Sequence, residues 1–238
     1  MQYHRGYFEL VQDVDFSDVD LDPIDVEPVI NDGTDVSDAI VEYTVKANNL
    51  RYGKVNLMAE HLVDMFPQNG TVMTQCFGET VVGMMLRIAR EQGKEIKLFC
   101  PETRPYFQGA RLTASVIHDM GFDVTVISDN MPAWTMHEKK VDVFTCAADA
   151  IIMDGCVVNK VGTLQIALAA KYWGIPVYVT GAPDKCHEKA SDVKIEERDP
   201  GLVLEALGNP TTAPGIKGYY PFLDYEMISF GHDTKDLN

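Results

Sequence analysis

Positive charge is scarce in this chain. Its 238 residues include 20 lysines and arginines against 36 aspartates and glutamates, which gives a formal net charge of -16. Between Gly6 and Val45 there is no lysine or arginine. Nucleic acids and anionic membranes require an extended basic surface, so the composition argues against both as general partners. A small anionic ligand is compatible with it, because a few local cations and helix N-termini are enough to hold one.

Paired cysteines and long apolar runs are also missing. The 5 cysteines are an odd number without the close pairs of a zinc site or a disulfide framework, as is typical of a reducing compartment. No apolar run approaches the roughly 20 residues of a membrane helix, and the first residues lack the pattern of a signal peptide. We therefore expect a cytoplasmic protein that binds no metal.

Three catalytic or cofactor-binding motifs are absent as well. No GxGxxG follows the first predicted strand, and no Walker phosphate loop occurs, which argues against dinucleotides and nucleoside triphosphates. No GxSxG element marks a serine nucleophile. We expect chemistry that uses no cofactor.

The N-terminal part of the chain divides into two regions. Residues 1–34 are rich in aspartate and lack the glycine and final glutamate of a calcium loop, so we predict a solvated acidic arm. Residues 35–69 carry apolar residues near helical spacing and end close to Pro67 and Gly70. This second region is predicted to form one or two helices.

From residue 70 onward, short β-branched runs alternate with amphipathic stretches. The predicted strands are residues 71–76, 95–100, 123–128, 141–147 and 176–180. The predicted helices are residues 79–92, 110–120, 133–139 and 163–173. This alternation predicts an α/β fold, a Rossmann-like doubly wound parallel sheet that spans residues 70–238 and ends in a wrapping tail. In such sheets ligands bind beyond the carboxyl ends of the strands.

Two candidate catalytic residues follow predicted strands. Cys76 stands just before a predicted helix, whose free amides and positive end are expected to lower the pKa of the thiol. The alternative for Cys76 is a small buried apolar residue. Asp149 follows an apolar strand, where partial burial is expected to raise its pKa towards a range suited to proton donation. The alternative for Asp149 is a helix or turn cap.

Three further residues are candidate ligands of an anion. Asn159 and Lys160 precede Gly162 and a predicted helix, so an amide, a cation and helix N–H groups are expected together. A surface turn with an N-cap is the alternative. Gln108 lies in a polar loop and is placed to bind the other end of the same ligand.

These motifs, in this order, resemble the family that unites methylthioribose-1-phosphate isomerase, ribose-1,5-bisphosphate isomerase and the regulatory subunits of initiation factor 2B. The resemblance covers roughly residues 49–230. It is carried by TQC (74–76), ETRPxxQGxR (102–111), AD (148–149), DG (154–155), NKVGT (159–163), Tyr178 and PFLD (221–224). Several motifs at consistent spacing make the signal specific.

The resemblance implies roles for these residues. Cys76 and Asp149 match the catalytic pair of the isomerases, a pair that the translation-factor branch typically lacks. Gln108, Asn159 and Lys160 match residues that hold the phosphorylated sugar. The isomerases also use arginines from a larger N-terminal helical domain, and Arg51 is the candidate for that role here. The implied activity is conversion of a C1-phosphorylated pentose, such as 5-methylthioribose 1-phosphate, to the ketose 1-phosphate.

Several alternatives stay open at this level. Residues 75 and 77–79 differ from the methylthioribose form, so 5-deoxyribose 1-phosphate and ribose 1,5-bisphosphate are alternative substrates. Asp149 is expected to protonate the ring oxygen, and Cys76, as a thiolate, is expected to take the C2 proton in an enolate-type route. The alternative is a hydride shift from C2 to C1, in which Cys76 and Asp149 handle only hydroxyl protons. The chain is expected to form a homodimer. The competing hypothesis is a non-catalytic sugar-phosphate-sensing subunit that needs a partner chain.

Overall fold

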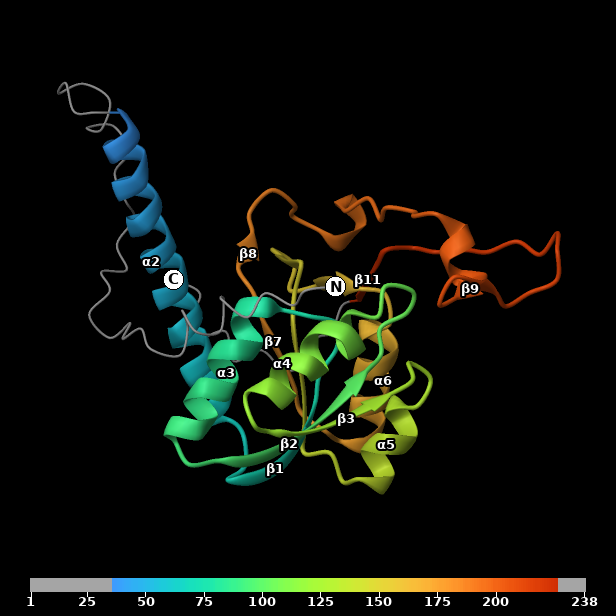
Figure 1. The fold of residues 1–238 in the computed structure, drawn as a ribbon, viewed down its shortest axis with the longest axis horizontal. Helices are drawn as coiled ribbons and strands as arrows, with labels where there is room; N and C mark the ends of the chain where they lie inside the picture. The colour runs from blue at the N-terminus through green and yellow to red at the C-terminus, as the bar shows by residue number, and fades with distance from the viewer. Residues whose placement is uncertain (1–35, 227–238) are drawn as a thin grey trace.

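The computed structural model describes residues 36–226, arranged as a layered α/β body with a second, smaller sheet beside it (Figure 1). The predicted acidic arm, residues 1–34, lies outside the described residues. Within the described part, no helix combines the length and the apolar character that crossing a membrane requires.

The main sheet has five parallel strands in the order β3-β2-β1-β4-β7. These strands are β1 (Asn69–Met73), β2 (Glu95–Pro101), β3 (Asp123–Ile127), β4 (Val143–Ala147) and β7 (Val177–Thr180). The strand order reverses between β1 and β4, and such a reversal opens a crevice at the carboxyl ends of the two strands. The fold class predicted from the sequence is confirmed.

Helices cover both faces of this sheet. They are α2 (Val36–Asp64), α3 (Glu79–Glu91), α4 (Ala114–Asp119), α5 (Pro132–Glu138) and α6 (Thr163–Trp173). Region 35–69 therefore contains one long helix, and region 110–120 begins as a π-helix, η2 (Gly109–Thr113), before it continues as α4. Figure 1 shows α2, α3 and α4 on one side of the sheet, with α5 and α6 on the other.

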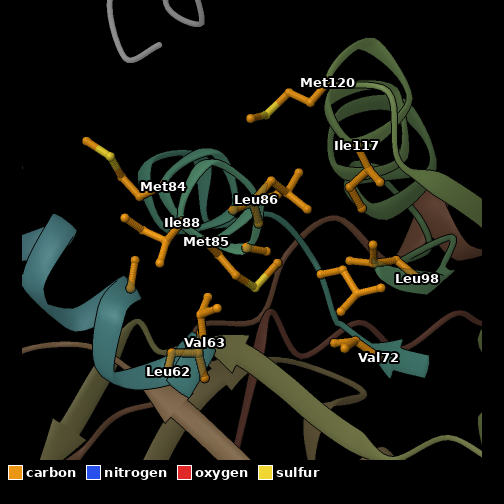
Figure 2. Packing of buried hydrophobic residues seen from close by; sticks show 14 of the residues in the cluster. Leu62, Val63, Val72, Met84, Met85, Leu86, Ile88, Leu98, Ile117 and Met120 are labelled. Carbon is orange, nitrogen blue, oxygen red and sulfur yellow. The ribbon is translucent and has the colours of Figure 1, made fainter. Parts of the chain in front are cut away.

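The larger core lies between α2, α3, α4 and the sheet. Leu62 and Val63 of α2 face Met85 and Ile88 of α3 in Figure 2, and Val72 of β1 lies to the right of this group. These side chains are almost completely buried, because apolar residues recur at helical spacing on α3 and at alternate positions on β1. A second cluster, which includes Phe144, Ile166 and Ala170, fills the opposite face.

The smaller sheet was not predicted from the sequence. Its order is β11-β6-β5-β8, formed by β5 (Ala150–Ile152), β6 (Val157–Lys160), β8 (Pro183–Asp184) and β11 (Leu223–Glu226). The expected C-terminal tail thus supplies a strand, since β11 pairs antiparallel with β6. The remaining short elements are η3 (Ala190–Asp192), η4 (Pro200–Val203), β9 (Glu205–Ala206) and β10 (Asn209–Pro210).

Candidate functional site

Cys76 lies at the crevice where the strand order reverses. Strand β1 ends at Met73 and helix α3 begins at Glu79, so Cys76 is in the segment that connects them. Its φ angle is 56°, in the left-handed region that a residue with a side chain rarely adopts. The hydroxyl of Thr113 donates a hydrogen bond to its backbone carbonyl and so ties this segment to η2. The connecting segment therefore holds the half-buried thiol at the edge of the sheet.

The expectation of a lowered thiol pKa is wrong. Burial raises the pKa of Cys76 above the ordinary value of 9.0, and this effect exceeds the opposing ones. The backbone N–H of Phe77 and the charge of Lys160 each act to lower this pKa. Helix α3 begins at Glu79, and the N–H group that acts to lower this pKa belongs to Phe77, which precedes the helix. At neutral pH Cys76 is mainly a protonated thiol.

Asp149 follows β4 on the other side of the same crevice. Its backbone N–H donates to the carbonyl of Val158 at 3.0 Å, which fixes the start of the β5–β6 hairpin. Asp149 is exposed to solvent. Desolvation nevertheless raises the pKa of Asp149, while the nearby ammonium of Lys160 acts to lower it. The predicted direction of the Asp149 pKa is confirmed.

Asn159 and Lys160 lie on the buried strand β6 rather than on a surface turn. Asn159 donates to the hydroxyl of Thr163 at 3.1 Å, and that hydroxyl donates to the Lys160 carbonyl at 2.8 Å. Asp224 accepts hydrogen bonds from the N–H groups of Gly162 at 2.6 Å and Leu164 at 3.3 Å. Two of the amides at the start of α6 are therefore already bonded to a carboxylate, so these two are not free for the ligand that the sequence led us to expect.

The ammonium of Lys160 is enclosed by aromatic rings. Its Nζ lies 4.6 Å from the ring centroid of Tyr220, 4.5 Å from that of Phe222 and 5.3 Å from that of Tyr106. Nζ also donates a hydrogen bond to the phenol oxygen of Tyr220. Burial lowers the pKa of Lys160, against the attraction of the Cys76 sulfur and the carboxylates of Asp129 and Asp149. The ammonium is thus the group that links both candidate catalytic residues electrostatically.

Gln108 lies at the start of η2, beyond a tightly held loop. The carboxylate of Asp129 accepts the backbone N–H groups of Thr103 at 2.7 Å and Arg104 at 2.6 Å. Among residues 36–226, the amide oxygen of Gln108 is buried without a hydrogen-bond partner, and so is that of Gln75 beside Cys76. A buried acceptor without a donor is costly unless a ligand or water supplies one. Gln75 was not among the residues selected from the sequence.

Arg51 is exposed on α2. No contact reported for the described residues joins Arg51 to Cys76, Asp149 or Lys160, so the structure gives its predicted role no support. The same part of the chain contains no group of three or more His, Cys, Asp or Glu side chains arranged to hold a metal ion.

The chain is similar to curated proteins that are named sugar-phosphate isomerases. The chain is 43% identical over 167 residues to methylthioribose-1-phosphate isomerase of Fervidobacterium nodosum, covering 67% of this chain and 47% of that protein. It is 35% identical over 179 residues to 5-deoxyribose 1-phosphate isomerase of Clostridium botulinum, covering 70% and 51%. The chain thus spans about half the length of the curated relatives it matches.

The chain is also similar in fold and sequence to solved structures. Subunit delta of translation initiation factor eIF-2B from A. fulgidus has a TM-score of 0.68 at 32% identity, covering 76% of this chain and 58% of that one. Form II of 5-methylthioribose 1-phosphate isomerase from Pyrococcus horikoshii OT3 has a TM-score of 0.66 at 30% identity, covering 76% and 56%. The model of the Initiation factor 2 subunit family matches residues 28–227. With most of its length matched, this chain belongs to the Initiation factor 2 subunit family.

Proposed function

We propose that this protein is an aldose–ketose isomerase that acts on a C1-phosphorylated pentose. One observation supports this most directly. Cys76 and Asp149 follow β1 and β4, the two strands that flank the reversal of strand order, and the ammonium of Lys160 interacts with both. Curated relatives named methylthioribose-1-phosphate isomerase and 5-deoxyribose 1-phosphate isomerase favour the same reaction class.

The proposed reaction needs one acid and one base. A phosphate on C1 prevents spontaneous ring opening, so Asp149 donates a proton to the ring oxygen as the ring C–O bond breaks. The hydrogen on C2 then moves to C1 with its electron pair, and the sulfur of Cys76 accepts the proton of the C2 hydroxyl. The product is a ketone at C2 with the phosphate retained on C1.

A hydride shift fits Cys76 better than removal of the C2 hydrogen as a proton. Burial leaves little thiolate at neutral pH, because it raises the pKa of Cys76. A carbon-bound hydrogen demands a stronger base than a hydroxyl proton does, so a scarce thiolate is better used on the hydroxyl. We propose 5-methylthioribose 1-phosphate as the substrate, with 5-deoxyribose 1-phosphate and ribose 1,5-bisphosphate as the alternatives.

Turnover in D₂O tests the activity and the route together. The protein is incubated with each of the three sugar phosphates, and the products are followed by ¹H and ¹³C NMR. We expect a ketose 1-phosphate from at least one of them, with no solvent deuterium on C1, since the C2 hydrogen is transferred directly. Deuterium on C1 would instead assign the C2 hydrogen to Cys76 as a proton. A folded sample that converts none of the three sugars contradicts the proposed function.

We also propose that the protein forms a homodimer. Large apolar side chains are exposed together on α5 and α6, where Trp134 is 69%, Tyr172 79% and Trp173 42% exposed. A contiguous apolar surface of this kind is characteristic of an interaction site. Light scattering coupled to gel filtration is expected to give twice the chain mass for active protein. An active monomer argues against the homodimer. An obligate complex with a different chain, without turnover by this chain, favours the sensing-subunit hypothesis.

A further inference from the structure

We propose that Lys160 and Arg198 form a two-cation anion site around the ring of Phe222, and that Arg198 is the second cation that binds the substrate phosphate. The phosphate as ligand rests on the proposed isomerase function. The anion site itself rests on geometry. It also supplies what the exposed Arg51 does not: a second positive charge next to Lys160.

Both cations contact the same aromatic ring. The Nζ of Lys160 lies 4.5 Å from the Phe222 ring centroid, and the Cζ of Arg198 lies 4.1 Å from it. Cations are attracted to an aromatic face, and these two distances to one centroid put Nζ of Lys160 and Cζ of Arg198 at most 8.6 Å apart. Arg198 also interacts with Lys160 strongly enough to lower its pKa.

The backbone fixes Arg198 in this place. Its N–H donates to the carbonyl of Tyr220 at 2.9 Å, and the N–H of Phe222 donates to the carbonyl of Glu196 at 2.8 Å. Glu197 and Pro221 form an isolated antiparallel bridge between these two bonds. Arg198 is therefore held opposite the segment that carries the rings around Lys160, and its position does not depend on its side chain alone.

The charges around the ring leave an excess of positive charge. Arg198 pairs with Glu196 through an Nε–Oε1 distance of 2.8 Å and an Nη2–Oε2 distance of 2.8 Å. Among residues 36–226, Lys160 has no carboxylate within ion-pair distance, and the contacts reported for its Nζ are the Tyr220 phenol and the three rings. A buried ammonium without a counter-ion is unfavourable, and an anion bound beside it removes that cost.

Arg198 is also accessible to such an anion. Its side chain is 36% exposed, so a ligand can reach the guanidinium donors that Glu196 leaves unused. The Tyr106 hydroxyl interacts with this guanidinium, and Tyr106 belongs to the same loop as Gln108. A planar guanidinium with an adjacent ammonium matches the tetrahedral oxygens of a phosphate monoester.

The test measures the binding of inorganic phosphate to the whole chain by isothermal titration calorimetry. We expect binding by the wild-type protein and a loss of roughly 10-fold or more in affinity for Arg198→Gln, the usual effect of removing a charge-assisted hydrogen bond. Lys160→Gln is expected to weaken binding as well. Arg198→Lys keeps the positive charge but loses the planar set of guanidinium donors, so it is expected to bind phosphate with intermediate affinity.

Arg90→Gln is the matched control. Arg90 on α3 also contacts an aromatic ring, with its Cζ 5.4 Å from the ring centroid of Phe122, but this ring is not part of the proposed anion site. Its phosphate affinity is expected to equal that of the wild type. Unchanged affinity in folded Arg198→Gln overturns the proposal, and so does a wild-type protein that binds no phosphate. If Arg198→Gln does not fold, unchanged affinity in Arg198→Lys and Phe222→Leu overturns it instead.

Turnover separates this proposal from the proposed function. If the protein is active, Arg198→Gln is expected to raise KM for the sugar phosphate by a larger factor than it lowers kcat, because it removes a binding contact. A change confined to kcat contradicts a binding role. Phosphate binding that depends on Arg198 in a protein without turnover supports the anion site and contradicts the isomerase.

Discussion

Cys76→Ala is expected to lower kcat/KM by about 10³-fold or more while the protein stays folded. Its sulfur is the proposed acceptor of the C2 hydroxyl proton, and a positioned acid or base typically contributes about 10²- to 10⁴-fold to the rate. The alanine side chain has no group that can replace it. Kinetics on purified protein with the sugar phosphate it converts, together with thermal unfolding, measure both parts of this prediction.

Cys186→Ala is the control for this substitution. Cys186 is exposed and lies in the turn after β8, where its backbone N–H donates to Asp184 at 2.8 Å, a bond that the variant keeps. Its kcat/KM is expected to match the wild-type value. Cys76→Ser retains the size of the side chain but has a far less acidic hydroxyl, so it is expected to be nearly as inactive as Cys76→Ala. Substantial activity in Cys76→Ala would remove Cys76 from the mechanism.

The main sheet could be predicted because its signals are local. Its five strands are short runs with their own sequence pattern, and β1, β2 and β3 are each followed by a helical segment, so periodicity within one segment is enough to recognise them. The smaller sheet lacks such signals. Strand β6 pairs with β11, more than sixty positions further along the chain, with Lys160 opposite Leu223. A strand of four residues that is stabilised by so distant a partner carries little pattern of its own.

The candidate site was predictable in position but not in electrostatics. Cys76 and Asp149 were expected at strand ends, and the parallel sheet brings two neighbouring strand ends together. The pKa of Cys76 depends on how much protein surrounds the sulfur, which the sequence does not specify locally. The contact between Arg198 and Phe222 was missed for a similar reason, since it needs the pairing of two irregular segments. No short motif marks that pairing.

Asp149→Asn is expected to reduce kcat/KM by about 10²- to 10⁴-fold, because an amide cannot donate the proton that opens the ring. Asp123→Asn is the matched control. Asp123 is an exposed carboxylate at the first residue of β3, the opposite end of the sheet from the proposed site, and its loss is expected to leave the rate unchanged. Equal activity of the Asp149 and Asp123 variants would contradict an acid role for Asp149.

The pH profile gives a sharper test of the same assignment. The productive form carries one proton over the Cys76–Asp149 pair, so wild-type activity is expected to fall below the Asp149 pKa, where both groups are protonated. It is also expected to fall above the Cys76 pKa, where both are ionised. These pKa values are raised above the ordinary 3.8 and 9.0 respectively. Without the Asp149 acid, the residual activity of Asp149→Asn depends on the Cys76 thiolate alone, so it is expected to rise with pH up to the Cys76 pKa and then level off. A fall in the activity of this variant at high pH would assign the high-pH limb to a group other than Asp149.

Thermal unfolding of Asp149→Asn checks that lost activity reflects chemistry rather than damage to the fold. A carboxyl whose pKa is raised in the folded protein binds its proton more tightly there than in the unfolded chain. Its ionised form therefore destabilises the fold once the pH exceeds both pKa values, and protonation removes that cost at low pH. The variant is expected to melt no lower than the wild type at pH 7, and any gain in Tm is expected to vanish as the pH approaches 3. A lower Tm at pH 7 would show that the Asp149 carboxylate holds the fold together, and the loss of activity could then not be assigned to proton transfer.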